Sequence, residues 1–173
     1  MRGRKILLVV FIVVFAVAAI YAWYPYSPMP AGTQIDKLVV QKSQRQLLAY
    51  EKGKLVKTFP ISLGRNPIGA KEFEGDKKTP EGTYFISAKN PNSGYHKNLG
   101  VSYPNQQNLE RAKQLGKPAG GDIKIHALRN YTGFIGRFQR CYDWTLGCIA
   151  LTNAEIDDLY AHTAVGTPII ILP

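Results

Sequence analysis

The chain has 173 residues, of which 45% are hydrophobic and 20% are charged. This length and composition fit one folded domain with a short appendage, and they exclude both a disordered chain and two domains that each bury a full core. The formal net charge is +10, from 22 Lys and Arg against 12 Asp and Glu, and the basic residues form no dense block. A basic protein attracts polyanions, and we interpret the excess as attraction to an anionic cell envelope. Nucleic acid is the alternative partner, and we expect none.

Cysteine and histidine are scarce, with two and three copies in the chain. A structural zinc site needs four clustered ligands of these types, and the spacing here offers no such cluster. The acidic pair Asp157-Asp158 falls in a predicted helix and is interpreted as a solvated face. We therefore expect neither a metal ion nor a cofactor.

The first segment of the chain is strongly apolar. Basic residues precede the run Ile6–Tyr24, which contains no charged side chain and has about the 20 residues that a membrane-crossing helix needs. Aromatic residues at its end suit a membrane interface, and Pro25 would stop the helix there. We predict an uncleaved signal-anchor in residues 1–24, with the rest of the chain exported because the positive end stays in the cytoplasm. A signal peptide cleaved after a small residue such as Ala22 is the alternative, and it leads to the same compartment.

Residues 25–33 are rich in proline and are predicted to be a semi-rigid linker, so that the folded domain is residues 34–173. Most of this domain shows strand signals, with Pro60 indicating an edge or a bulge. The predicted strands cover residues 36–42, 45–51, 55–63, 83–88, 122–128, 149–151 and 166–172.

Two helices are predicted between these strands. Residues 106–115 form one, and a second begins at Asn153 as its N-cap and ends near Thr163. Residues 64–82 are expected to be a loop and residues 90–121 mainly irregular apart from the first helix. The fold class is therefore mostly β with one or two short helices, behind an N-terminal membrane helix.

Cys148 is the candidate nucleophile. A lone cysteine is commonly a packed core residue, but here Gly147 precedes it and lets a substrate approach the backbone. Thr145 adds a hydroxyl group, and the polar and aromatic flanks Asp143 and Trp144 are typical of the mouth of a site. The main-chain amides of the Gly147–Cys148 turn are candidates to stabilise an oxyanion.

A cysteine nucleophile needs a base, and His126 is the best candidate. In residues 122–128 the apolar Ile123 and Ile125 alternate with Lys124 and His126, so His126 lies on the polar face near the end of a predicted strand. By residue type alone, the other two histidines are rivals; they are His96 and His162.

Taken together, these residues resemble the L,D-transpeptidase catalytic domain family (YkuD-like), with features of its YafK-like branch. The resemblance covers almost the whole exported part, from about Ile35 to Pro173. It rests on Ile125-His126-Ala127, Thr145-Leu146-Gly147-Cys148-Ile149, Thr79-Pro80-Glu81-Gly82-Thr83-Tyr84, Tyr95-His96, Tyr103-Pro104-Asn105, Asp143-Trp144-Thr145 and Thr152-Asn153.

The resemblance implies a β-sandwich-like catalytic domain that acts on peptidoglycan stem peptides, outside the bacterial inner membrane in the periplasm. Cys148 would attack the carbonyl between the third and fourth stem residues, with His126 as base and then as acid, while Thr145 and Gly147 shape the pocket. Transfer of the acyl group to an amine makes a transpeptidase, and transfer to water makes a carboxypeptidase or an amidase. The chain departs from the usual family pattern at Ala127, Leu146 and Ala150, and this bears mainly on the acceptor.

Four further residues are candidate substrate contacts, each with a plain structural alternative. His96 either contacts substrate or forms a hydrogen bond within a loop, and Tyr103 either lines the cleft or packs in the core. Arg137 and Arg140 lie between the base and the nucleophile, where they either bind a stem-peptide carboxylate in bidentate fashion or remain solvated.

Cys141 is the second cysteine of an exported domain. It either pairs with Cys148, which would silence the nucleophile, or stays free and packed, which we favour. Two other functions remain open on these residues. A non-catalytic peptidoglycan-binding module on a membrane helix explains the charge but not the thiol, and a papain-like peptidase would want an Asn or Asp to orient the base.

Overall fold

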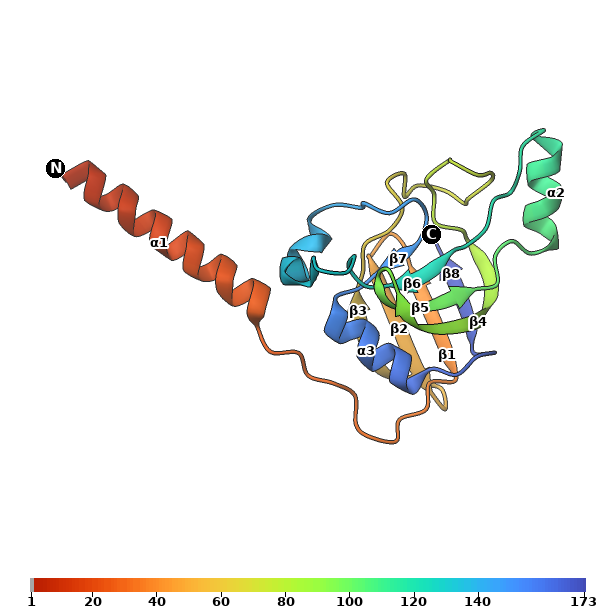
Figure 1. Ribbon diagram of the computed structural model, residues 1–173, viewed down its shortest axis with the longest axis horizontal. Helices are drawn as coiled ribbons and strands as arrows, with labels where there is room; N and C mark the ends of the chain where they lie inside the picture. Colours follow the sequence, from red (N-terminus) through yellow and green to blue (C-terminus); the bar gives the residue numbers. More distant parts are fainter. Residues whose placement is uncertain (1) are drawn as a thin grey trace.

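The computed structural model describes residues 2–173 and shows a helix standing apart from a domain built on one curled sheet (Figure 1). In this part of the chain the sheet has eight strands in the order β3-β2-β1-β8-β4-β5-β6-β7. The mostly β fold class with few helices is thereby confirmed. The strands are β1 (Lys37–Gln41), β2 (Gln46–Glu51), β3 (Lys54–Pro60), β4 (Gly82–Ser93), β5 (His96–Val101), β6 (Lys124–His126), β7 (Ile149–Ala150) and β8 (Pro168–Leu172).

One half of the sheet is an antiparallel meander of β1, β2 and β3, joined through β1 to the parallel β8. The Leu- and Ala-containing β2 would suit a helix, but Leu47 and Ala49 bury completely against the core when the segment is extended. β3 lies at the edge of the sheet, as Pro60 predicts.

The other half begins at β4, which pairs with β8 on one side and with β5 on the other. The expectation that residues 90–121 are mainly irregular is wrong for residues 90–93, which extend β4, and for His96–Val101, which form β5 between β4 and β6. This segment contains Asn98 and Gly100 and lacks a clear apolar alternation, so its extended form depends on pairing with both neighbours. A Cβ atom at Gly100 would lie 2.9 Å from the Ser87 hydroxyl oxygen on the neighbouring β4, which favours glycine at this position of β5.

The two edges of the curled sheet are bridged where the chain leaves β3. Ser62 and Ala150 exchange two main-chain hydrogen bonds of 3.0 and 2.8 Å. The next residue, Leu63, accepts from the Thr145 N–H at 3.1 Å, and the Arg65 N–H donates to the Thr145 carbonyl at 3.0 Å. The turn that leads into β7 is therefore held against the opposite edge of the sheet.

Two helices of the domain match the predicted segments. The helix α2 (Gln106–Gln114) lies at the far side of the domain from the N-terminal helix, and α3 (Asn153–His162) packs on β5 (Figure 1). Asn153 is the first residue of α3, so the prediction that it is the N-cap is wrong by one position. Thr152 is the cap, because its N–H and hydroxyl donate to the Glu155 carboxylate at 2.9 and 2.7 Å.

The 3₁₀ segment η1 (Gly133–Cys141) was not expected from the sequence. It lies between β6 and β7, beside the carboxyl-terminal end of α1 (Arg2–Trp23) (Figure 1). Within α1, Gly3–Ala22 is long and apolar enough to cross a membrane, by length and composition, and none of it is buried in the protein.

Residues 25–33 pass from α1 to the domain. Met29, within this predicted linker, is buried in the core, and its N–H donates to the Asp158 carboxylate at 3.0 Å. The Tyr26 hydroxyl donates to the same carboxylate. The linker is thus fastened to α3 along part of its length.

Candidate active site

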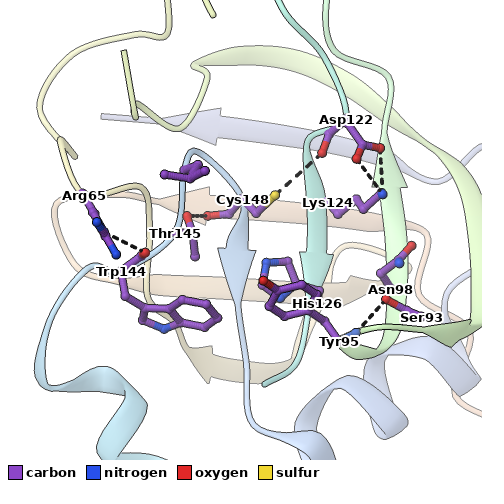
Figure 2. A pocket seen from close by; sticks show the side chains of 11 residues that line it. Arg65, Ser93, Tyr95, Asn98, Asp122, Lys124, His126, Trp144, Thr145 and Cys148 are labelled. Carbon is purple, nitrogen blue, oxygen red and sulfur yellow. Dashed lines mark hydrogen bonds and ion pairs between the residues drawn. The ribbon is translucent and has the colours of Figure 1, made fainter. Parts of the chain in front are cut away.

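A cleft of about 560 Å³ opens over β5, β6 and the turn before β7 (Figure 2). It contains Cys148, His126 and Thr145, three of the residues singled out from the sequence. The lining residues are Arg65, Ser93, Tyr95, Asn98, Asp122, Lys124, His126, Trp144, Thr145, Leu146 and Cys148.

The pairing of β6 with β7 places His126 and Cys148 on the same face of the sheet. The strands are parallel, with His126 opposite Ala150, so extending the register by two residues places Cys148 opposite Lys124. Side chains alternate between the faces of a strand, and Lys124, His126 and Cys148 therefore face the cleft while Ile125 faces the core.

The ring of His126 is held in one orientation. Its Nδ1 lies 2.6 Å from the Ala127 carbonyl oxygen, which only accepts hydrogen bonds, so Nδ1 carries the proton and Nε2 is the acceptor. The ring contacts both Tyr95, at 4.7 Å between centroids, and Trp144, at 5.7 Å in an edge-on arrangement. Burial lowers the pKa of His126, with the charge of Lys124 acting in the same direction and the Ala127 bond opposing both. The imidazole is therefore neutral at neutral pH and suited to take a proton.

Cys148 is a free thiol. Its Sγ donates to the Asp122 carbonyl oxygen at 3.7 Å, so in this conformation the thiol points toward Asp122 and not toward the His126 ring (Figure 2). Burial raises the pKa of the Cys148 thiol, and the Asp122 charge adds to this. The main-chain N–H of Lys124 and the charges of Lys124 and Lys71 oppose that increase. The resting sulfur is therefore protonated and needs a base before it can act.

The turn before Cys148 is fixed by the Thr145 hydroxyl. This hydroxyl donates to the Cys148 carbonyl at 2.7 Å and accepts from the Gly147 N–H at 3.1 Å. Gly147 has φ +134°, and a Cβ atom there would lie 2.7 Å from the Lys78 carbonyl oxygen. Both the backbone conformation and the lack of space therefore require glycine.

The loop of residues 64–81 packs against this turn and depends on a buried lysine. Lys42 is 2% exposed, and its Nζ donates to the carbonyls of Gly69 and Thr79 at 2.7 and 3.1 Å and to the Glu81 carboxylate at 2.7 Å. The Thr79 hydroxyl in turn accepts from the Gly64 N–H at 3.0 Å. The Thr-Pro-Glu-Gly segment noted in the sequence therefore supports the wall of the cleft.

A second buried ion pair stabilises the same loop. The Lys71 Nζ lies 2.8 Å from the Asp76 carboxylate, and both side chains are 4% exposed. Burial acts to raise the pKa of Asp76, but the Lys71 bond and main-chain N–H groups hold that pKa below its ordinary value. Lys71 thus keeps a paired positive charge near Cys148.

The residues before the turn are oriented by Gln139 of η1 and by residues near β2 and β3. The Trp144 indole N–H donates to the Gln139 side-chain oxygen at 2.8 Å, and the Gln139 carbonyl accepts from the Ser62 hydroxyl at 3.0 Å. The Asp143 carboxylate forms an ion pair with Arg45 at 2.8 Å. Trp144 is therefore positioned by η1, which carries Gln139.

Two of the residues predicted as substrate contacts lie outside the cleft lining. The His96 Nε2 is bonded to the Asp157 carboxylate on α3 at 2.8 Å, and the neighbouring Lys97 forms an ion pair with the same carboxylate at 2.7 Å. Tyr103 is 5% exposed, and its hydroxyl donates to the Ala119 carbonyl at 3.0 Å. His96 is thus bonded to α3, and Tyr103 packs in the core.

Arg137, Arg140 and Cys141 belong to η1 and also do not line the cleft. The Arg137 guanidinium donates to the Tyr21 carbonyl at 3.2 Å, and Arg140 forms a largely buried ion pair with Glu155. Cys141 is free and exposed rather than packed.

Several cleft residues were not singled out from the sequence. Lys124 could have been predicted, since it lies two residues before His126 and therefore on the same face of the strand. Asn98 falls in the strand that was expected to be irregular, and Arg65 lies in a loop. For Tyr95, the family resemblance was the only feature of the sequence that pointed to a role in the site. Among residues 2–173, no three His, Cys, Asp or Glu side chains group closely enough to hold a metal ion.

Comparison with known proteins places this geometry in a family. Residues 35–171 match YkuD, the L,D-transpeptidase catalytic domain. The protein YafK of Escherichia coli (strain K12) is 26% identical over 125 residues, which is 69% of this chain and 43% of YafK.

Solved structures show the same fold. The helical cell shape determining protein Pgp2 from Campylobacter jejuni is 26% identical, with a TM-score of 0.57 over 84% of this chain and 50% of that one. Bd1075 of Bdellovibrio bacteriovorus is 22% identical, with a TM-score of 0.56 over 84% of this chain and 50% of that one, and supports the fold alone. The chain spans about half the length of these structures and less than half of YafK. It belongs to the L,D-transpeptidase catalytic domain family.

Proposed function

We propose that the protein is a peptidoglycan L,D-transpeptidase in which Cys148 is the nucleophile and His126 is the base. The observation that carries this proposal is the shared face of β6 and β7, which directs the thiol and the imidazole into one cleft, with Nδ1 of His126 bound to Ala127 and Nε2 left as the acceptor. A non-catalytic binding module has no need of a neutral, oriented imidazole beside a free thiol.

The first half-reaction begins with rotation of the thiol away from the Asp122 carbonyl toward His126. Nε2 of His126 takes the thiol proton, and the sulfur attacks the carbonyl between the third and fourth residues of a stem peptide. The Gly147 N–H already donates to the Thr145 hydroxyl and is not available to the substrate. The Cys148 N–H of the same turn is therefore the donor that stabilises the developing oxyanion. Collapse breaks the C–N bond, His126 returns the proton to the leaving amine, and a thioester remains on Cys148.

The second half-reaction regenerates the thiol. An amine from another stem peptide or a protein attacks the thioester, His126 takes its proton, and Cys148 leaves as the thiolate that is then reprotonated. Water in place of the amine gives a carboxypeptidase or amidase by the same steps.

The cleft also offers positive charge for a stem-peptide carboxylate. Arg65 uses its Nε to donate to the Trp144 carbonyl at 3.1 Å, which leaves the terminal nitrogens of the guanidinium free to face a substrate. Lys124 lies on the other side of the cleft, paired with Asp122 at 2.7 Å. We therefore assign the carboxylate contact suggested for Arg137 and Arg140 to Arg65, because Lys124 is already paired.

We further propose that α1 anchors the protein in the bacterial inner membrane with the domain in the periplasm. The support is the length and apolar composition of Gly3–Ala22 and the basic residues before it. The mass of the protein recovered from its native membrane tests this directly, since cleavage near Ala22 would remove α1.

The proposed chemistry is tested with the full chain in detergent. Incubation with a carbapenem should add one acyl group, detected as a mass shift, and Cys148→Ala should abolish it while Cys141→Ala should not. Purified peptidoglycan fragments then identify the acceptor by mass spectrometry, because a cross-link indicates a transpeptidase and a shortened stem indicates a hydrolase. An adduct that persists in Cys148→Ala would disprove the assignment.

A further inference from the structure

Residues 129–142, which contain η1 and are called the cap below, present large aromatic side chains to solvent. Tyr131 is 99% exposed, Phe134 is 75% exposed and Tyr142 is 66% exposed. None of the three lines the catalytic cleft. Exposed aromatics gathered on one short segment indicate a surface that binds something apolar.

The cap is also positively charged. It contains Arg129, Arg137 and Arg140 and no Asp or Glu. Arg140 is neutralised by Glu155, but Arg129 and Arg137 form no ion pair with any residue in the range 2–173. A surface that combines arginine with aromatic side chains matches the chemistry of an anionic membrane interface.

The end of α1 lies directly against the cap. The Arg137 guanidinium donates to the Tyr21 carbonyl at 3.2 Å and lies 5.5 Å from the centre of the Tyr24 ring. The rings of Tyr21 and Phe138 are 5.8 Å apart. Figure 1 shows α1 leading away from the domain, with the cap beside its carboxyl-terminal end. The residues at that end are those that meet the headgroups when α1 crosses a bilayer.

We propose that the cap rests on the outer surface of the membrane that α1 crosses. Its aromatic side chains lie among the lipid headgroups, and Arg129 and Arg137 face anionic phosphates. The proposal depends on the anchor proposed above and is independent of the catalytic assignment. The lipid surface is the expected partner of the cap because the cap contacts the end of the helix that enters that surface.

The cap is connected to the cleft through Gln139. This cap residue is 3% exposed and binds the indole of Trp144, whose ring packs on His126. A cap fixed on the membrane therefore holds one wall of the cleft close to the bilayer, where the peptidoglycan nearest the membrane is the substrate within reach.

The test uses the full chain reconstituted in liposomes of phosphatidylcholine and phosphatidylglycerol. In a Cys148→Ala background, an environment-sensitive fluorophore is attached to Cys141, the exposed last residue of η1. The matched probe is Lys113→Cys on α2, far from α1, in a chain that also carries Cys141→Ser. Lipids brominated near the headgroup should quench the probe at 141 and not at 113, and aqueous iodide should quench in the opposite order.

Two variants sharpen the result. Tyr131→Ser with Phe134→Ser should abolish lipid quenching at 141, whereas Phe85→Ser, an exposed aromatic on β4, should preserve it. Flotation of the liposomes reports on the anchor separately. Floated protein in which iodide quenches 141 and 113 equally overturns the cap contact, and protein that does not float overturns the anchor on which the cap depends. If protection of the probe at 141 from iodide requires added peptidoglycan, the cap binds the cell wall and the proposal is overturned. If that protection rises with the density of protein in the liposomes, the cap binds a second copy of the chain, and the proposal is likewise overturned.

Discussion

The indole N–H of Trp144 donates to the Gln139 side-chain oxygen at 2.8 Å, so a residue of η1 orients a ring that packs against His126. Tyr95 completes a cluster of three rings, because it contacts the imidazole and also stacks on the indole at 6.4 Å. The proposed base is therefore aligned by two aromatic rings, one of which depends on the segment between β6 and β7.

Removal of the Trp144–Gln139 bond should slow acylation. Gln139→Met leaves the indole N–H without its acceptor, and we expect a decrease of about five-fold in the rate of carbapenem acylation, since a hydrogen bond contributes about 1 kcal/mol. A double-mutant cycle with Trp144→Phe measures the coupling. If the two single effects simply add in the double variant, the bond has no part in positioning the base.

The pH dependence of thiol reactivity in the free protein follows from His126 and Cys148. Burial lowers the pKa of His126, so the imidazole is already neutral at neutral pH, and burial raises the pKa of the Cys148 thiol. Alkylation of Cys148 by iodoacetamide should therefore rise with pH, with a midpoint above the ordinary thiol value of 9.0. The rates are measured by mass spectrometry, with the exposed Cys141 in the same chain as an internal reference. A midpoint well below that of Cys141 would mean that the thiol rests as a thiolate, and the base would then not be needed.

The same lowered pKa predicts an effect of pH on stability. A histidine whose folded pKa lies below its unfolded value of 6.5 contributes fully to stability above 6.5, and that contribution is lost as the pH falls through the lower, folded value. The unfolding temperature should therefore decrease below about pH 6.5, and the decrease should be smaller in His126→Gln. An equal decrease in both proteins would assign the acid sensitivity to other groups.

Gly147→Ala should disable the turn. The added methyl group would sit at φ +134° and 2.7 Å from the Lys78 carbonyl, and such strain costs about 1–3 kcal/mol. We expect a lower unfolding temperature together with loss of acylation. Gly94→Ala is the matched control, because a Cβ atom there meets no heavy atom within 4 Å. Equal behaviour of the two variants would show that the turn tolerates a side chain.

The sequence predicts those parts of the site that follow from a local pattern, and it does not predict those that depend on contacts with other segments. Alternation in residues 122–128 is local, and it correctly placed His126 and Lys124 opposite the buried Ile125. The strand His96–Val101 has no such pattern, because its extended form comes from its neighbours. Gln139 gave no signal for a related reason, since its role depends on a hydrogen bond to a side chain beyond the kinked segment that carries it.

The sequence offered Arg140 as a carboxylate contact or as a solvated charge, and the structure places it in a third situation, a largely buried ion pair. Arg140 was a candidate for carboxylate binding, but it is paired with Glu155, whose side chain is 6% exposed and also caps α3. Arg140→Met should therefore lower the free energy of unfolding by about 3 kcal/mol, because it leaves a buried carboxylate without its partner. Arg137→Met, on the same segment and without an ion pair among residues 2–173, should have little effect. Thermal unfolding of both variants measures the difference, and a raised KM with unchanged stability in Arg140→Met would restore the substrate role.

The buried Lys42 is the least expected support of the cleft, since a lysine in a turn directly after a strand usually extends into solvent. Its ammonium group joins Glu81 to the carbonyls of Gly69 and Thr79, and methionine offers the same length without any donor. Lys42→Met should cost about 3 kcal/mol of unfolding free energy, because Glu81 loses its partner and the two carbonyls lose their donor. The loop of residues 64–81 would then release the turn at Gly147, so acylation should fall even at temperatures where the variant stays folded. Lys54→Met, which changes an exposed lysine on β3, is the matched control and should leave both stability and acylation unchanged. A folded Lys42→Met protein that acylates at the normal rate would show that this loop does not position the nucleophile.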